Sequence, residues 1–302
     1  MPITRRRLLK TSAGLLAATA APRFAIAETA AGTGTVTSLS DGSLTLPANM
    51  IIGDTPMDHV QPILDKYNVS SEAFTPPCNL TLYQDGERTV LFDAGSGLEF
   101  MASAGQIHDS LDAVGLSADD ITDIVFTHAH PDHLWGLLDD FGDIAFSEAT
   151  FHIGRKEFDY WSDPETINTI GEARVPFAVG AKRRLDEIAD VIQLFEDQDQ
   201  ILPNVTAVAS YGHTPGHMSF MIDGEAGNAF VIGDAIGNHH IAFARPDLPS
   251  GSDQNAEEGI QTRVAMMDML AADNVPIIGF HLPDGGMGRV ARDGDGYVFN
   301  AE

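Results

Sequence analysis

The sequence is poor in cysteine and in basic residues, and each shortage excludes a class of protein. Cys78 is the single cysteine, so the chain forms no internal disulfide, no Cys-x-x-Cys redox pair and no metal cage of thiolates. Lysine and arginine together number 17 against 44 aspartates and glutamates, which gives a formal net charge of −27. A chain this acidic repels a polyanion, so we exclude a nucleic-acid partner that is bound through its phosphates. No run of about 18 apolar residues is present, so we predict no membrane-spanning segment.

In other respects the composition is that of an ordinary globular protein. The chain has 302 residues, of which 43% are apolar and 20% are charged. That length is sufficient for a large buried core, built either as one domain of two layered halves or as two small domains.

The N-terminal segment has the features of an export signal. Residues 4–10 (TRRRLLK) match the twin-arginine pattern, residues 11–21 are small and apolar, and Ala25-Ile26-Ala27 supplies an A-x-A cleavage site. We therefore predict a twin-arginine signal peptide over residues 1–27, a single domain over residues 28–302, and a periplasmic or secreted protein with no membrane attachment after cleavage. Residues 1–27 carry five basic and no acidic residues, so their removal changes the net charge to −32. Proteins exported this way often carry a metal or cofactor, which points weakly to a metal.

Strand-like and helix-like patterns alternate along the rest of the chain. The apolar runs predict strands at residues 36–46 (two short strands around an Asp41-Gly42 turn), 80–83 and 89–92 (a hairpin), 121–126, 205–209, 229–232 and 275–279. Stripes of apolar residues predict helices at residues 107–114, 181–194 and 260–270. Histidine or aspartate follows several of these strands, which is typical of a site at one edge of packed sheets.

The strongest such case is the run from His128 to His133, with the sequence HAHPDH. Side chains alternate in an extended segment, so His128 and His130 face the same way and can coordinate one metal ion. Pro131 is expected to begin a helix whose first turn carries Asp132 and His133. From this position the two side chains can bind a second ion.

This run resembles the signature of the metallo-β-lactamase superfamily, and further motifs of that superfamily follow in the expected order. They are Asp93 in LFDAG, the loop GHTPGH from Gly212 to His217, Asp234 after Gly233, and His281 after IIGF. The motifs span residues 93–281. The resemblance implies an α/β (α+β) fold class, the four-layer αβ/βα metallo-β-lactamase sandwich.

The resemblance also implies two metal sites. The first would consist of His128, His130 and His217, the second of Asp132, His133 and His281, and the carboxylate of Asp234 would be shared. Asp93 and His213 would support these ligands from behind. Five imidazoles and two carboxylates suit two divalent ions, foremost Zn²⁺, with Mn²⁺, Co²⁺ or Fe²⁺ as alternatives. Asp132 and Asp234 would be the catalytic carboxylates, holding a metal-bridging hydroxide that attacks an ester bond.

Within the superfamily, the sequence is most similar to the methyl parathion hydrolase and lactonase-like branch. The branch lines the mouth of its site with aromatic residues, and the matching positions are Phe100, Trp161 and Phe177. His239 and His240 follow Asp234 on a segment that could overhang the pocket and contact substrate. We therefore expect an exported dinuclear hydrolase that cleaves lactone, ester or phosphotriester bonds of a small molecule, and a homodimer is possible.

Other functions remain open alternatives. Many lactonases have a tyrosine three residues after the bridging aspartate, but this chain has Gly237 there. A glyoxalase-II-like thioesterase would keep the ligands, yet only Arg289 and Arg292 are basic beyond His281. The remaining alternatives are an iron-dependent oxidoreductase of the same fold and a binding protein without activity. True β-lactamases of the superfamily lack a bridging aspartate such as Asp234.

Overall fold

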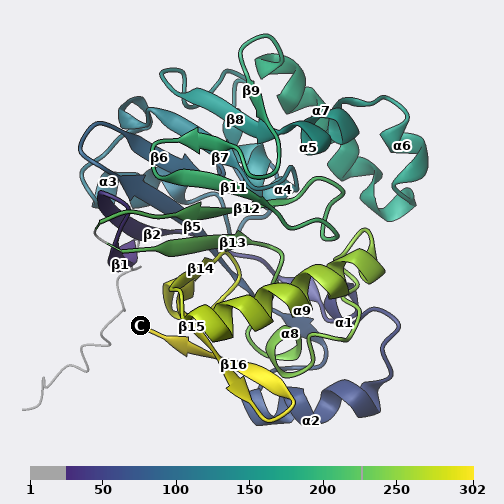
Figure 1. The fold of residues 1–302 in the computed structure, drawn as a ribbon. Coiled ribbons are helices and arrows are strands. Elements are labelled where there is room, and N and C mark those ends of the chain that lie inside the picture. The colour runs from purple at the N-terminus through teal and green to yellow at the C-terminus, as the bar shows by residue number, and fades with distance from the viewer. Residues whose placement is uncertain (1–24, 226) are drawn as a thin grey trace, which may run out of the picture.

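The computed structural model describes residues 25–225 and 227–302. Within these residues the chain forms two seven-stranded sheets that face each other, with helices on both outer faces (Figure 1). This is the four-layer sandwich that the sequence motifs predict. Residues 1–24 of the predicted signal peptide lie outside the described residues, whereas residues 25–27 belong to the first strand.

The first sheet is built by the N-terminal half of the chain. In spatial order its strands are β1 (Ala25–Ala31), β2 (Gly34–Ser43), β5 (Pro77–Gln84), β6 (Thr89–Phe92), β7 (Asp123–Phe126), β8 (Thr150–Gly154) and β9 (Gln193–Phe195). Strands β6 to β9 run parallel to one another, and β1, β2 and β5 complete the sheet with antiparallel pairs.

The second sheet is built by the C-terminal half. Its strands follow chain order as β10 (Gln200–Leu202), β11 (Val205–Ala209), β12 (Met218–Ile222), β13 (Ala229–Gly233), β14 (Ile277–Gly279), β15 (Met287–Asp293) and β16 (Gly296–Ala301). Only β13 and β14 are parallel here, and the segment that connects them contains α8 (Ile241–Ala244) and α9 (Ala256–Asp273). A two-stranded ribbon of β3 (Leu46–Pro47) and β4 (Ala73–Phe74) lies outside both sheets.

The α-helices of the described residues lie on the outer faces of the sandwich and at the edge that carries the motifs. They are α1 (Asn49–Ile52), α2 (Met57–Tyr67), α3 (Ile107–Ala113), α4 (Pro131–Leu134), α5 (Arg155–Ser162), α6 (Thr166–Thr169), α7 (Val175–Ile188), α8 (Ile241–Ala244) and α9 (Ala256–Asp273). Figure 1 shows α3, α5 and α7 against the first sheet, and α8 and α9 against the second.

Strand β7 shows how the layers are joined. All four of its residues are buried, and their side chains alternate between two cores. Ile124 and Phe126 pack in the core between the first sheet and its helices, while Val125 packs in the core between the two sheets. Phe92 and Phe220 meet across that inner core, with ring centroids 5.2 Å apart. Because β7 is buried on both faces, it is a rigid base for the loop that follows it.

The carboxyl ends of the parallel strands place the functional residues. β6, β7 and β8 run in the same direction, so the loops that leave them lie at one edge of the first sheet. Strands β13 and β14 are also parallel, so the loops that follow them lie together at one edge of the second sheet. Open sheets with parallel strands bind ligands at such an edge. The motifs of Asp93, His128–His133, Asp234 and His281 lie in these loops, whereas the GHTPGH motif lies between the antiparallel strands β11 and β12.

Two of the elements expected from the sequence differ in the structure. Residues 36–46 do not form a hairpin around Asp41-Gly42, because β2 runs through both residues with a register shift between Ser40 and Ser43. The helix expected at 181–194 is α7, which begins earlier, at Val175, with Pro176 in its first turn, and ends at Ile188. Val191 and Ile192, which the expected helix included, lie between α7 and β9.

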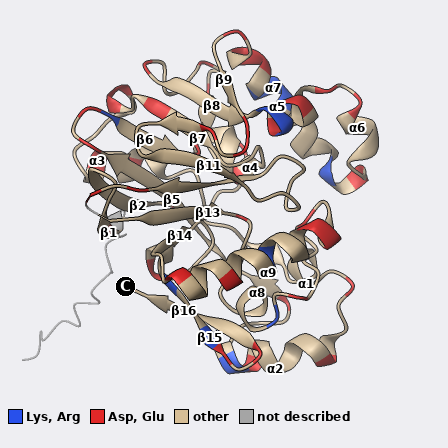
Figure 2. Ribbon diagram, in the orientation of Figure 1, with Lys and Arg blue, Asp and Glu red and all other residues tan. Residues whose placement is uncertain are grey.

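Figure 2 shows acidic residues spread over both halves of the molecule, in keeping with the net charge of −27 for the whole sequence. In residues 25–225 and 227–302, no helix combines the length and the hydropathy that crossing a membrane requires.

Candidate metal centre

The loop after β7 carries the first histidines of the site. His130 is extended (φ −66°, ψ 160°) and precedes α4, and Pro131 occupies the first turn of that helix. Proline is favoured there because its fixed φ suits a helix start and its missing N–H is not needed. His128 and His130 therefore project from an extended segment, whereas Asp132 and His133 project from the helix, as the sequence predicts.

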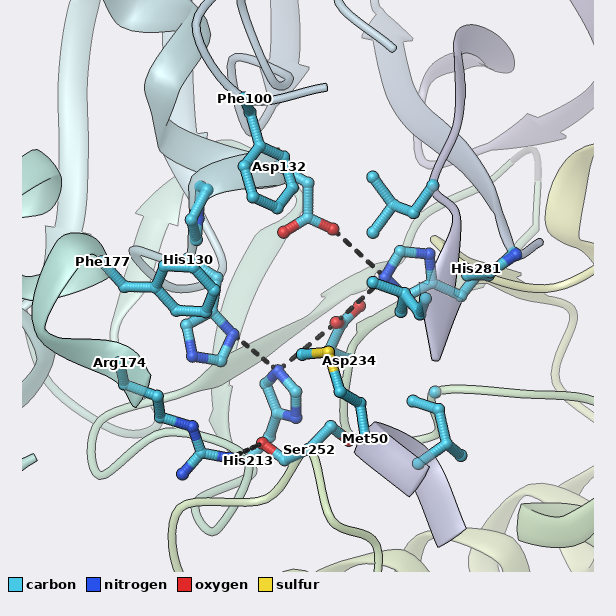
Figure 3. A pocket seen from close by; sticks show the side chains of 16 residues that line it. Met50, Phe100, His130, Asp132, Arg174, Phe177, His213, Asp234, Ser252 and His281 are labelled. Atoms are coloured by element: carbon cyan, nitrogen blue, oxygen red, sulfur yellow. Dashed lines mark hydrogen bonds and ion pairs between the residues drawn. The ribbon is translucent and has the colours of Figure 1, made fainter. Parts of the chain in front are cut away.

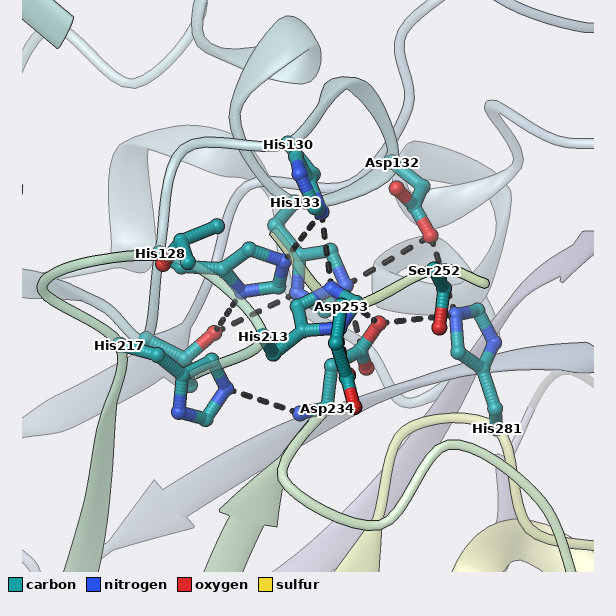
Figure 4. A network of polar contacts seen from close by, with 12 residues as sticks. His128, His130, Asp132, His133, His213, His217, Asp234, Ser252, Asp253 and His281 are labelled. Atoms are coloured by element: carbon teal, nitrogen blue, oxygen red, sulfur yellow. Dashed lines mark hydrogen bonds and ion pairs between the residues drawn. The ribbon is translucent and has the colours of Figure 1, made fainter. Parts of the chain in front are cut away.

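Three imidazoles converge beside this loop (Figure 4). His128 Nε2 lies 3.1 Å from His130 Nδ1, which lies 2.9 Å from His213 Nε2. All three residues are buried, and their ligand atoms are close enough to share one metal ion.

A second group lies next to the first. Asp132 Oδ2 is 3.2 Å from His281 Nε2 and 3.5 Å from His133 Nε2. Asp234 Oδ2 is 3.3 Å from His281 Nε2, and its Oδ1 is 3.5 Å from His133 Nε2. Asp234 Oδ2 also lies 3.4 Å from His213 Nε2, so this carboxylate reaches both groups. The expected shared position of Asp234 is thus present in the geometry.

These residues fit a pair of divalent ions. In a tetrahedral site with bonds of about 2.0–2.1 Å, neighbouring ligand atoms lie about 3.3 Å apart, and the separations above range from 2.9 to 3.5 Å. His133 Nε2 and Asp234 Oδ1 are buried without a hydrogen-bond partner, which is costly unless another group satisfies them. Both orphaned atoms face into the second group, where a cation would satisfy them.

The two groups differ in their electrostatics. Burial and neighbouring imidazoles hold the pKa of His128 and His130 well below the usual range, so both stay neutral and can bind a metal. Burial opposes charge on His281 too, but Asp234 and Asp132 outweigh it and raise its pKa to about 10. The same balance, dominated by Asp93 and Asp132, raises the pKa of His133. The second group therefore attracts positive charge strongly.

The structure places His213, rather than the expected His217, beside His128 and His130. Both ring nitrogens of His217 are occupied, because Nδ1 contacts Ser210 Oγ at 2.8 Å and Nε2 accepts a hydrogen bond from the backbone N–H of Asp234 at 2.9 Å. In this geometry His213 lies in the first group and His217 supports Asp234 from behind, while the sequence-based assignment of His217 as a metal ligand stays a prediction. The two histidines are four residues apart in one loop, so their order alone does not distinguish them.

Further groups orient the ligands by engaging the ring nitrogen that faces away from the site. Asp93 Oδ2 lies 2.7 Å from His133 Nδ1, as expected for a supporting residue, and Asp93 also accepts from the N–H of Thr127. Asp253 plays this part for His213, with Oδ1 3.4 Å from Nδ1, and buried Arg263 holds Asp253 at 3.2 Å. Sequence reasoning missed Asp253, because it lies in a loop without a motif.

Sequence reasoning also missed Glu157, a fully buried carboxylate on α5. Its Oε1 accepts hydrogen bonds from Ala129 N (2.9 Å) and Trp161 Nε1 (2.6 Å), and its Oε2 accepts from Thr214 Oγ1 (2.8 Å) and Gly216 N (2.9 Å). Ala129 separates two ligands of one loop, while Thr214 and Gly216 follow His213 in another. One carboxylate thus ties together the two loops that form the first group.

We expect Glu157→Gln to lower the metal affinity of the first group by about 10- to 100-fold, the usual cost of disturbing the support of a ligand. The amide replaces one acceptor with a donor, which must then face a backbone N–H or a hydroxyl. Competition of the variant with a chromophoric chelator for Co²⁺ or Zn²⁺ measures the affinity. Asp123→Asn is the matched control, since Asp123 is a buried carboxylate that bonds His152 at the opposite end of β7. Unchanged affinity in folded Glu157→Gln would contradict this role.

The pocket above the two groups has an apolar wall (Figure 3). It is lined by Phe100 and Phe177, as expected, together with Leu44, Leu46, Met50, Ile51, Pro76, Pro131, Arg174, Gly237 and Ser252. Phe100 and Phe177 contact each other edge to face, with centroids 6.1 Å apart. The guanidinium of Arg174 is held at the rim by the carbonyls of Gly251 and Ser252.

The remaining three pocket residues expected from the sequence lie elsewhere. Trp161 is fully buried in the core beneath the first group, where its Nε1 donates to Glu157, so its assignment to the pocket mouth is wrong. Trp161 lies near the end of α5, which points the indole inward. His239 and His240 do not line this pocket and instead line a neighbouring cavity, described below.

The family of the chain follows from comparison with family models. The model of the metallo-β-lactamase superfamily matches residues 74–276, about two thirds of the chain. The chain belongs to the metallo-β-lactamase superfamily. The predicted superfamily, its fold and the class of metal-dependent hydrolase are therefore confirmed. A comparison with curated proteins gives no match.

Solved structures share the fold over almost the whole chain. AidC, described as a dizinc quorum-quenching lactonase in complex with a product, N-hexanoyl-L-homoserine, has a TM-score of 0.86 and 22% identity, covering 93% of this chain and 99% of its own. AbOPH, a hydrolase in the β-lactamase superfamily, has the same TM-score and coverage at 24% identity. AiiA of B. thuringiensis, a mutant with N-decanoyl-L-homoserine at its active site, has a TM-score of 0.60 and 17% identity, covering 84% and 95%. At these identities the likeness shows the fold.

Proposed function

We propose that the protein is a dinuclear hydrolase of uncharged lactones, carboxylic esters or phosphotriesters. The observation that carries this proposal is the pair of ligand groups joined by Asp234 at the bottom of a pocket with an apolar wall. The polar floor suits the bond that is cleaved, and the apolar wall suits the organic groups on either side of it. We further propose zinc as the resident metal, because imidazoles dominate the first group and no thiolate contributes.

In this proposal the side chains have different roles in hydrolysis. His128, His130 and His213 would hold one ion, Asp132, His133 and His281 the other, and Asp234 both. When bound, two such ions lower the pKa of water and polarise the oxygen of the scissile bond. Asp132 and Asp234 would hold the attacking water in place. Phe100 and Phe177 exclude bulk water from the pocket and contact the organic group of the substrate.

Lactones and open-chain esters make different demands on this site. AidC and AiiA are described with homoserine products, which supports lactone hydrolysis by a protein of this fold. The residues that line the described pocket include no tyrosine, and Gly237 offers no side chain to polarise a carbonyl. The proposal therefore includes aryl esters and phosphotriesters, whose better leaving groups need less assistance.

A substrate panel tests the proposed function. The protein loaded with Zn²⁺ is assayed on N-acyl homoserine lactones, p-nitrophenyl esters and p-nitrophenyl phosphotriesters, before and after treatment with a chelator. We expect hydrolysis of at least one class, its loss on chelation, and its return with Zn²⁺, Mn²⁺ or Co²⁺. Protein that holds two ions yet hydrolyses none of the three would refute the proposal.

We also propose that the protein is exported through the twin-arginine pathway. The supporting observations are the RRR motif and the A-x-A site of residues 1–27. Cleavage after Ala27 would leave Glu28–Ala31 to continue the pairing of β1 with β2. Cell fractionation tests this proposal, because uncleaved protein confined to the cytoplasm would contradict it.

A further inference from the structure

A second cavity, here called the side cavity, lies beside the metal pocket. Its lining residues are Ile51, Asn68, Val69, Ser70, Ala73, Phe74, Thr75, Pro76, Pro77, Gly237, Asn238, His239, His240, His281 and Pro283. The side cavity holds about 470 Å³, whereas the metal pocket holds about 80 Å³. Small-molecule sites usually have about 300–1,000 Å³, so the larger space next to the metals is the side cavity.

The two cavities meet at four residues that line both: Ile51, Pro76, Gly237 and His281. His281 is one of the second group of ligands, so the side cavity begins directly beside the metal centre. A group attached to a scissile bond at the metals needs only to pass this junction to enter it.

Gly237 keeps the junction open. A Cβ atom placed on this residue meets no other atom within 4 Å, and its φ lies outside the left-handed region. Neither sterics nor backbone strain therefore requires glycine here. A longer side chain could be accommodated by the fold, and it would project into the junction of the two cavities.

The lining of the side cavity suits an uncharged group. None of the described residues that line it is an aspartate, glutamate, lysine or arginine. Burial lowers the pKa of His240 to about 3 and lowers that of His239, so both rings stay neutral. His240 Nδ1 accepts from the N–H of Ile241, which leaves Nε2 as the protonated nitrogen. A charged group would find no counterion, while a neutral one finds amides, hydroxyls and rings.

We propose that the side cavity is a second substrate-binding site, which takes the larger uncharged group of the substrate, an aryl ring or an N-acyl amide, and that Gly237 sets which groups can enter it. This inference rests on the proposed function, because it assigns the substrate class of the same centre. Phe74 and the ring of His240, with centroids 5.1 Å apart, supply an aromatic surface for such a group. Asn68, Ser70, Thr75 and Asn238 supply hydrogen-bonding groups.

The test is Gly237→Tyr, with Gly237→Ala as a smaller step that the fold tolerates. Two series of uncharged esters are hydrolysed: one keeps a small leaving group and enlarges the acyl group, and the other keeps an acetyl group and enlarges the leaving group. We expect Gly237→Tyr to lower kcat/KM for the large members of one series by at least about tenfold relative to its effect on the small members of the same series. The affected series identifies which side of the ester occupies the side cavity.

Binding gives a readout that is independent of turnover. Acetanilide, a neutral aryl amide, is titrated into the wild-type protein and into Gly237→Tyr, with charged 4-acetamidobenzoate as the matched probe. We expect wild type to bind acetanilide more tightly than the benzoate, and Gly237→Tyr to lose that binding. Equal binding by both proteins, or equal effects on small and large esters, would overturn the side-cavity proposal. Absence of hydrolysis with acetanilide bound as expected would instead refute the proposed function.

Discussion

Replacing Asp234 with Asn is expected to lower kcat by about three orders of magnitude and to weaken both metal sites together. The carboxylate of Asp234 lies 3.3–3.5 Å from imidazole nitrogens of both ligand groups, so one substitution removes a charge from both. Loss of several kcal/mol of stabilisation at a metal centre corresponds to about a thousandfold in rate. Steady-state kinetics and the metal content of the purified variant measure the two effects.

Asp41→Asn serves as the control for Asp234→Asn. Asp41 is buried like Asp234, and it accepts hydrogen bonds from the backbone of Ser96, Gly105 and Ile107 without contacting the ligands. Its replacement should cost stability in denaturant but keep both ions. If Asp234→Asn lost metal from one group and kept full affinity at the other, its shared position would be contradicted.

His213→Ala is expected to remove one ion per chain and to lower kcat by at least about a hundredfold, whereas His217→Ala is expected to keep both ions at saturating Zn²⁺. His213 points Nε2 at the other ligands. In contrast, both ring nitrogens of His217 are engaged in hydrogen bonds, one with Ser210 and one with the backbone N–H of Asp234. Loss of His217 leaves a buried N–H without its acceptor, which costs about 1–3 kcal/mol of stability. Equilibrium dialysis and urea unfolding separate the two variants.

The opposite pattern, with His217→Ala losing an ion and His213→Ala keeping both, would confirm the assignment made from the sequence. The two outcomes are distinguishable even if both variants are less stable than wild type, because the ion count is taken on folded protein.

The ligands of the loop after β7 could be predicted because they depend on local geometry. The alternation of an extended segment sets the directions of His128 and His130, and Pro131 starts the helix that carries Asp132 and His133. The roles of His213 and His217 depend instead on which ring nitrogen finds a partner from another strand. That partner is the N–H of Asp234, 17 residues away, and no local pattern reveals it.

Glu157 and Trp161, which the sequence analysis missed or misplaced, also depend on contacts between distant segments. Glu157 lies on the exposed-looking sequence RKEFDYW, yet α5 buries it against two loops from different sheets. Trp161 is on the same face of α5, one turn later, and is buried with it. Helical periodicity places them together, but only the tertiary packing shows that this face points into the molecule.

The measurement that tests the account most directly is the number of metal ions in active protein. Purified protein is dialysed, its turnover is assayed on a substrate from the panel, and its metal content per folded chain is determined by elemental analysis. The account predicts close to two divalent ions per chain, with activity falling in proportion as a chelator removes them. Full turnover by protein that holds less than one ion per chain would contradict it.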